Sequence, residues 1–161
     1  MRLRVWMAAL LLLAIMPALA QSTHDLETSK VVVNDQHAKD LLLGSHRLSL
    51  QWISWDAFGT VNIADSNGQM RIKGEQKGVD NPDDYLRIDG VIKQVGAKSF
   101  SFVGIISTRV SDVNHGAPCE RSGAMTFRMS GARKYWRLKE MENPCGPPEE
   151  RVTDYVDVYL R

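Results

Sequence analysis

The stretch CERSGAMTFRMSGARKYWRLKEMENPC, residues 119–145, decides the fold of this chain. Within it, residues 124–130 and residues 133–141 each alternate apolar and polar side chains, which is the period of a β-strand with one buried face. Gly131 lies in the short gap between them, where a tight turn favours glycine. The stretch therefore predicts an antiparallel β-hairpin.

The turn also determines which side chains lie opposite each other in the predicted hairpin. Pairing of Ser130 with Arg133 places Phe127 beside Trp136 on one face. That face is wholly apolar, so the turn and the alternation agree on a hairpin with one side in a core.

The chain's two cysteines, Cys119 and Cys145, flank this hairpin at about equal distances from its turn. Pairing of the strands brings the thiols within bridging reach, so export to an oxidising compartment predicts a disulfide, with two free buried thiols as the alternative. On the chain-entropy model such a bridge stabilises the fold by about 3 to 4 kcal/mol. A metal site is not expected, because the sequence has no second cysteine pair and its histidines are scattered.

Residues 1–20 have the order of a secretory signal. Arg2 and Arg4 come first, an apolar run occupies residues 5–15, and a small-residue ending leads to Ala20. The apolar run is too short to span a bilayer comfortably. We predict cleavage after Ala20 and a periplasmic or secreted protein without a stable membrane anchor.

Removal of this signal from the 161 residues leaves 141, a length that fits one domain. We expect residues 21–34 to be loosely ordered and residues 35–161 to form the domain, as a monomer. The whole chain has 20 basic and 19 acidic residues, and both charges lost with the signal are positive, so the mature net charge is −1. This balance argues against nucleic acid or an anionic membrane as the main partner.

A short helix is predicted near the start of the domain. Asn34 or Asp35 can cap it through a side-chain oxygen, and Gly44 is a typical stop. Its apolar face carries Ala38, Leu41 and Leu42. We expect this helix to cover one side or end of the core.

Alternation typical of half-buried strands recurs along the rest of the chain. These patterns occupy residues 47–55, 60–65, 85–93, 98–110 and 153–161. Asn67-Gly68 is a strong type I′ hairpin signal, because both central residues of that turn need positive φ. The turn places Ile63 opposite Ile72.

A second connection, of three residues around Gly96, pairs Ile92 with Phe100. About eight strands with short connections predict an all-β fold, namely an antiparallel up-and-down β-barrel with one short N-terminal helix. A two-sheet β-sandwich is the alternative, because alternation shows one buried face but not whether the first and last strands pair.

Large aromatic side chains occupy inward positions of these strands. They are Trp52, Phe100, Phe102, Phe127 and Trp136. They either fill the barrel or line a cavity for an apolar ligand, and filling is favoured because aromatics ordinarily fill so small a barrel. Trp55 is out of phase with Trp52, so it either contacts a partner protein or returns to the core at a bulge.

Two polar groups are also candidates for function. Ser111, Asp112 and His115 are the residue types of a hydrolytic triad, but within one five-residue loop they can hardly adopt its geometry, and turn formation explains them. We expect no enzymatic activity and no cofactor.

The outer face of the 119–145 hairpin is basic. It carries Arg128, Arg133, Lys134, Arg137 and Lys139. Either it meets an acidic partner or phosphate-bearing envelope component, or it pairs with acidic residues near the last strand. Those acidic residues are Glu149, Glu150, Asp154 and Asp157. A solvated cross-strand charge ladder is the favoured interpretation.

Three stretches resemble a family of small secreted bacterial proteins of unknown function. They are QWISWDAFG at residues 51–59, RKYWRLKEMENPC at residues 133–145 and TDYVDVYLR at residues 153–161. The resemblance implies a common fold but no activity, substrate or catalytic residue. The first-strand tryptophan is also similar to that of lipocalins, which have glycine two residues earlier, where this chain has Leu50. That departure weakens ligand transport as an analogy.

The sequence favours a non-enzymatic periplasmic or secreted β-barrel that binds a small apolar or amphipathic molecule. An envelope protein-interaction or inhibitor module, acting through Trp55 and the surface loops, is the alternative. The interior distinguishes the two, since an open barrel suits a ligand and a filled one suits a surface partner.

Overall fold

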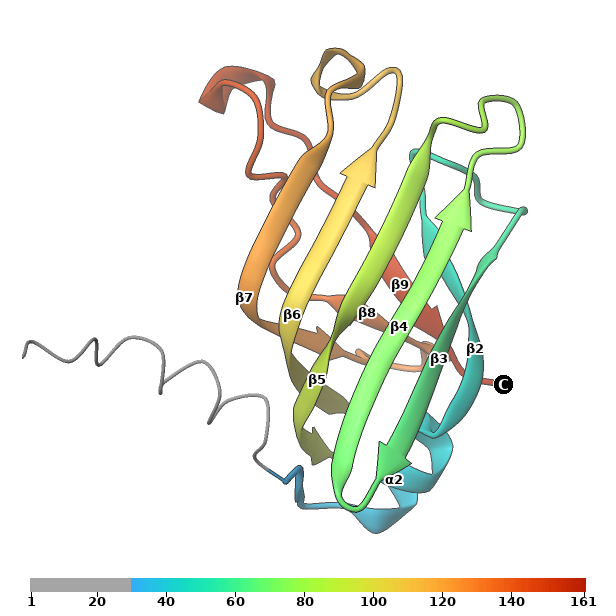
Figure 1. The fold of residues 1–161 in the computed structure, drawn as a ribbon, viewed down its shortest axis with the longest axis vertical. Coiled ribbons are helices and arrows are strands. Elements are labelled where there is room, and N and C mark those ends of the chain that lie inside the picture. Colours follow the sequence, from blue (N-terminus) through green and yellow to red (C-terminus); the bar gives the residue numbers. More distant parts are fainter. Residues whose placement is uncertain (1–29) are drawn as a thin grey trace, which may run out of the picture.

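The computed structural model describes residues 30–161, and most of these residues lie in strands (Figure 1). The strands of the barrel are β2 (Gly44–Leu50), β3 (Gly59–Ser66), β4 (Gln69–Lys77), β5 (Tyr85–Gly96), β6 (Ser99–Arg109), β7 (Cys119–Arg128), β8 (Tyr135–Leu138) and β9 (Val156–Tyr159). Short 3₁₀ turns, η1 (Asn114–Gly116) and η2 (Pro148–Glu150), lie in the connections. The predicted signal and residues 21–29 lie outside the described residues.

Each of these strands pairs antiparallel with its neighbours in the chain, and β9 also pairs with β2. The eight strands therefore close into an up-and-down barrel, so the barrel prediction is confirmed over the sandwich. Closure requires β9, because β2 and β8 would otherwise both present an open edge.

Two short elements precede the barrel, namely β1 (Val32–Val33) and α2 (Gln36–Leu42). β1 pairs in parallel with the end of β5, so the domain begins upstream of residue 35. α2 begins after Asp35, whose carboxylate accepts a hydrogen bond from the Ala38 N–H at 2.7 Å.

α2 covers the end of the barrel opposite the long loops (Figure 1). Ala38 and Leu42, four residues apart, are buried in the core. Leu41 is exposed, so its predicted place in the apolar face is wrong. The helix has seven residues, and two of its three predicted apolar positions contact the barrel.

The β3–β4 hairpin has the predicted turn and register. Asn67 and Gly68 have φ values of 55° and 85°, and Ile63 lies opposite Ile72. The type I′ signal is therefore sufficient here to determine the pairing.

Two other hairpins have a register that differs from the prediction by two residues or more. Ile92 lies opposite Phe102 and not Phe100. The turn consists of the two residues between Gly96 and Ser99, not of three residues around Gly96, and Lys93 is an extra residue in β5. Phe127 lies opposite Leu138 and not Trp136. A shift of two residues keeps the same side chains inward, so alternation cannot detect it.

Gly90 and Gly104 lie opposite each other where β5 and β6 approach closely. A Cβ atom on Gly104 would lie 2.2 Å from the backbone oxygen of Asp89 and 2.5 Å from the Gly90 Cα. Both obstacles are backbone atoms that cannot rotate away. This pair therefore requires glycine for the barrel to curve.

We predict that Gly104→Ala lowers the free energy of unfolding by roughly 1 to 3 kcal/mol, the usual range for overpacking. Urea unfolding followed by tryptophan fluorescence measures the change. Gly96→Ala is the matched control, because a Cβ there meets Ser99 atoms only at 3.6 Å or more. Equal stability of the two variants would contradict the proposed close approach.

A partly buried ion pair attaches α2 to the barrel. Lys39 Nζ lies 2.6 Å from Asp65 Oδ2, and the Gly68 N–H donates to Asp65 Oδ1 at 2.8 Å. The hydrogen bond from Lys39 lowers the pKa of Asp65 below its ordinary value of 3.8.

A lowered pKa in the folded state means that ionised Asp65 stabilises the fold above pH 3.8, and that this stability is lost as the pH falls through the folded-state pKa. We predict that the stability difference between the wild type and Asp65→Asn is constant near neutral pH and disappears in acid. Thermal unfolding across pH measures it. In a Lys39→Met background the same substitution should show a weaker pH dependence, because only the hydrogen bond from the Gly68 N–H then remains. An unchanged dependence would refute the pairing.

Candidate functional site

The most distinctive surface feature is the connection between β2 and β3, residues 51–58, which we call the rim loop. It lies at the end of the barrel that carries the long loops (Figure 1). The Leu50 carbonyl accepts hydrogen bonds from the N–H groups of Ile53 and Ser54. The Ser54 hydroxyl in turn accepts from the N–H groups of Asp56 and Ala57 at 3.1 and 2.8 Å. The loop is therefore closed on itself by hydrogen bonds.

Two glutamines attach the rim loop to the strands on either side. The buried Gln76 side chain donates to the Ala57 carbonyl at 2.8 Å and accepts from the Leu50 N–H at 2.7 Å. Gln51 donates to the Thr153 carbonyl at 2.6 Å and accepts from the Tyr155 N–H at 2.7 Å. The loop is thus fastened to β4 on one side and to the start of β9 on the other.

Trp52 belongs to the rim loop and not to the barrel interior. β2 ends at Leu50, and Trp52 is 42% exposed, so the prediction that Trp52 faces inward is wrong. Its indole N–H donates to Asp154 Oδ1 at 3.2 Å. The tight turn after Leu50 ends the strand five residues before the end of the alternating pattern, which runs to Trp55.

Trp55 lies further along the same loop, and its side chain is 57% exposed. This exposure excludes the alternative in which Trp55 returns to the core. A large apolar side chain is therefore presented to solvent on a backbone held by hydrogen bonds.

Beneath Trp52 lies a buried polar cluster centred on Asp154. Arg121 forms a short ion pair with Asp154 Oδ2, and the Asn143 amide donates to the same oxygen at 3.0 Å. Burial raises the pKa of Asp154 and lowers the pKa of Arg121, while their mutual attraction opposes both shifts. Among the described residues, every fully buried side-chain N or O atom has a hydrogen-bond partner.

The predicted disulfide adjoins this cluster. Cys119 and Cys145 are joined across 26 residues, as the sequence indicated. Asn143 accepts a hydrogen bond from the Cys145 N–H at 3.0 Å. The bridge therefore secures the segment that supplies Asn143 to Asp154.

We predict strong coupling between Arg121 and Asp154. Asp154→Asn alone leaves a buried guanidinium without its counter-charge and should lower the free energy of unfolding by about 3 to 5 kcal/mol. Arg121→Met combined with Asp154→Asn should be less destabilised than the sum of the single changes. Urea unfolding of the four proteins gives the coupling free energy, and simple additivity would contradict a direct pair.

The other four aromatic candidates fill the barrel. Phe100, Phe102, Phe127 and Trp136 are at most 3% exposed. Ring centroids of Phe100 and Phe127 lie 5.0 Å apart, and those of Phe100 and Trp136 lie 5.9 Å apart. A hollow of about 10 Å³ remains at the mouth, next to Trp52 and Asp154, which is close to the space of one water molecule. These side chains are core.

The residues of the 111–115 loop do not assemble into a triad. The Ser111 hydroxyl donates to Asp84 at 2.8 Å, which fastens two loops together. His115 is exposed and pairs with Glu150 at 3.4 Å. Ser111 and His115 thus have different acidic partners, and neither is placed to activate the other.

The basic hairpin pairs with acidic residues less than the charge-ladder interpretation expected. Arg137 forms two hydrogen bonds of 2.7 Å with Asp157, but Asp157 is buried and not solvated. Asp154 pairs with Arg121 instead. Glu150 lies in η2 and pairs with His115 of η1. Among residues 30–161, Arg137–Asp157 is the one ion pair of the expected ladder that forms.

No local pattern in the sequence indicates the cluster around Asp154. Arg121 lies 33 residues from Asp154, and Asn143 lies 11 residues from it. Only closure of the barrel brings these three side chains together.

Two further findings concern the described residues alone. Within residues 30–161, no helix has the length and apolar character needed to cross a membrane. The same residues contain no group of three or more His, Cys, Asp or Glu side chains arranged to hold a metal ion.

The fold defines a class of small closed β-barrel proteins with closely packed aromatic side chains in the core and an internal disulfide. A family model described as the PM1083 family matches residues 30–160, and the chain belongs to this family. It is 42% identical over 119 residues to an uncharacterised protein, PM1083, of Pasteurella multocida (strain Pm70), a match that covers 74% of this chain and 73% of the relative. No solved structure matches the chain significantly. The resemblance to an uncharacterised family is confirmed, and it brings no activity with it.

Proposed function

We propose that the protein is a non-enzymatic binding module of the cell envelope that engages a partner protein through the rim loop, with Trp55 as the anchor. The observation that carries the proposal is an exposed tryptophan on a loop held from both sides. The predicted secretory signal supports a periplasmic or secreted location.

The filled interior argues against the first hypothesis from the sequence, a small apolar ligand inside the barrel. Ligand cavities have volumes of roughly 300 to 1,000 Å³. The hollow at the mouth, at about 10 Å³, is far below that range. Entry of a ligand would require displacement of aromatic side chains such as Phe100 and Phe127, which stack on each other.

The fixed shape of the rim loop favours a surface partner. Binding orders the groups at an interface, and this ordering has an entropic cost. The side chains of Gln51 and Gln76 donate hydrogen bonds to backbone carbonyls around this loop, and the Ser54 hydroxyl accepts one from the Ala57 N–H. The backbone around Trp55 is therefore largely ordered before a partner arrives. Tryptophan is enriched among the residues that dominate interface energies. Truncation of such an anchor typically costs about 2 kcal/mol or more of binding free energy.

Site-specific photo-cross-linking in cells tests the proposal. A benzophenone amino acid at position 56, next to the intact Trp55, should give one dominant adduct with a protein of the envelope, since Asp56 is also exposed. The matched control is position 32, because Val32 is 56% exposed but lies in β1 near the opposite end of the barrel. No adduct at position 56, or the same adducts from both positions, would refute the proposal.

A competition experiment adds a second measurement. Purified wild-type protein in excess should suppress the adduct, whereas Trp55→Ala should suppress it about 30-fold less effectively, as expected for a loss of about 2 kcal/mol. Trp55→Ala should unfold at nearly the same temperature as the wild type, because the side chain is exposed. Equal competition by the two proteins would exclude Trp55 as the anchor.

A further inference from the structure

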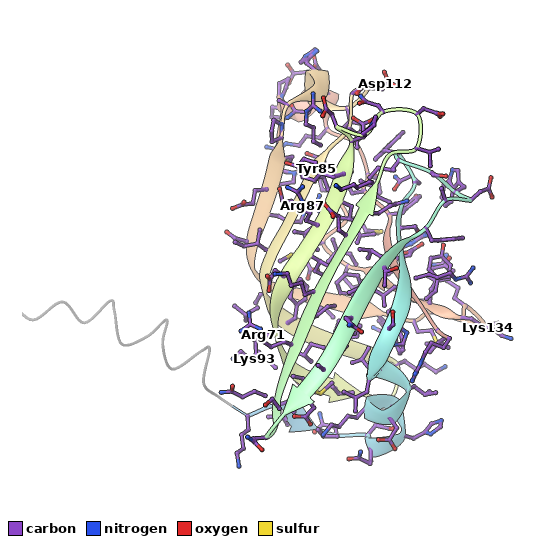
Figure 2. All side chains as sticks on the ribbon, turned by 45° about the vertical axis from the view of Figure 1, so that its right-hand side comes forward. Arg71, Tyr85, Arg87, Lys93, Asp112 and Lys134 are labelled. Atoms are coloured by element: carbon purple, nitrogen blue, oxygen red, sulfur yellow. A yellow bond between two sulfur atoms is a disulfide. The ribbon has the colours of Figure 1, made fainter. Side chains whose placement is uncertain are left out.

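A second surface feature lies on the outer face of β4, β5 and β6, close to the long loops. The register places Lys77 and Arg109 directly opposite Tyr85, one on each side. Arg87 follows two residues along β5 and lies on the same face, as Figure 2 shows for Tyr85 and Arg87. Its guanidinium carbon lies 4.2 Å from the centroid of the Tyr85 ring. Three cationic side chains therefore surround one tyrosine.

These side chains line a solvent-open hollow of about 530 Å³ on the outer face of the barrel. Pro82 and Asp83 from the loop after β4, and Pro118 before β7, complete the wall. The lining therefore contains three cations, Lys77, Arg87 and Arg109, and one carboxylate.

Each of the three cations keeps donors for a ligand. Arg109 uses its Nε to donate to the Gly116 carbonyl at 3.0 Å, and its Nη1 lies 3.5 Å from Asp83. The Asp83 side chain is 79% exposed, so this contact is weak. Arg87 donates a hydrogen bond from its Nε to Glu75 at 2.8 Å. Its two terminal nitrogens have no hydrogen bond to another side chain among residues 30–161, so both can donate to a ligand. Lys77 forms no ion pair within residues 30–161.

The loop that carries Pro82 and Asp83 is held in place. The Gly78 N–H donates to the Asp84 carbonyl at 2.8 Å, and the Asp84 N–H donates to the Asn81 carbonyl at 3.0 Å. The Asp84 carboxylate accepts from the Ser111 N–H at 3.0 Å, which links this loop to the next one. The wall of the hollow is therefore preorganised.

The neighbouring charges on the same sheet are arranged differently. Arg71 and Lys73 both lie 3.4 Å from the carboxylate of Asp89 and form an ordinary exposed charge ladder. In the hollow, Arg87 pairs with Glu75 and Arg109 pairs with Asp83, while Lys77 has no acidic partner among residues 30–161, so one positive charge there is not compensated. A guanidinium fork beside an ammonium group is the set of donors that binds a phosphate group.

We propose that this hollow is an anion site that binds the phosphate group of a phosphorylated ligand, with Lys77, Arg87 and Arg109 as its donors. The site is separate from the rim loop and does not depend on the function proposed for Trp55. Tyr85 positions Arg87 by stacking under its guanidinium, as cation–π pairs do.

Calorimetric titration of the purified protein with inorganic pyrophosphate tests the site. We expect saturable 1:1 binding that weakens at least about tenfold in Arg109→Gln and in Lys77→Gln, since a charge-assisted hydrogen bond is lost in each. Arg71→Gln is the matched control, because it removes one positive charge from the same sheet outside the hollow. Trp55→Ala should leave the affinity unchanged.

Two results would overturn the proposal. The first is the absence of saturable binding. The second is equal weakening by Arg71→Gln and Arg109→Gln, which would show attraction to net charge alone. Co-sedimentation with phosphatidylglycerol vesicles, against phosphatidylcholine vesicles, distinguishes the source of the phosphate. Vesicle binding that requires Arg109 indicates a lipid headgroup, and pyrophosphate binding without vesicle binding indicates a soluble phosphorylated molecule.

Discussion

The insertion of β9 between β8 and β2 is the interaction on which the rest of the structure depends. β9 has only four residues, and it pairs over three positions with each neighbour. Its inward side chains, Val156 and Val158, are fully buried, which supplies apolar contact on the core side. Without β9 the meander from β2 to β8 would be an open, curved sheet with two unpaired edges. Closure therefore determines the fold, the buried core and the position of the C-terminal segment.

We call the pairing of β9 with β8 and β2 the seam of the barrel. Side chains on its outer face add contacts that compensate for the shortness of these strands. Asp157 is buried on the outer side of β9, where Arg137 of β8 holds it through two parallel hydrogen bonds that raise the pKa of the guanidinium. The Arg137 guanidinium lies 4.0 Å from the Tyr155 ring centroid, and the rings of Tyr135 and Tyr159 lie 5.3 Å apart. Aromatic rings over an ion pair exclude water and strengthen it. The seam is thus closed by backbone pairing inside a covering of arginine and tyrosine.

The sequence predicted what depends on local pattern and failed where distant residues decide. Alternation identified the strands and their inward faces, and Asn67-Gly68 determined one register. Alternation cannot separate registers that differ by two residues, which is why the predicted partner of Phe127 is wrong.

The placement of single side chains depends on more distant contacts. The pattern predicts an inward Trp52 because nothing local shows that β2 ends at Leu50. Asp154 was assigned to a solvated ladder because its real partner, Arg121, lies 33 residues away. Trp55 is a candidate from the sequence because it breaks the alternation, but only the structure shows that its side chain is exposed.

Closure of the barrel and the shape of the rim loop are physically linked. Residues just before β9 bind the loop: Asp154 accepts from the Trp52 indole, and the backbone of Thr153 and Tyr155 bonds to Gln51. These contacts exist only when β9 is paired with β2, since that pairing brings Leu50 beside Val156. The disulfide supports the same arrangement through Asn143. An interaction that completes the hydrophobic core therefore also fixes the loop that presents Trp55. The stability of the barrel closure and the fixed shape of the rim loop have one physical origin.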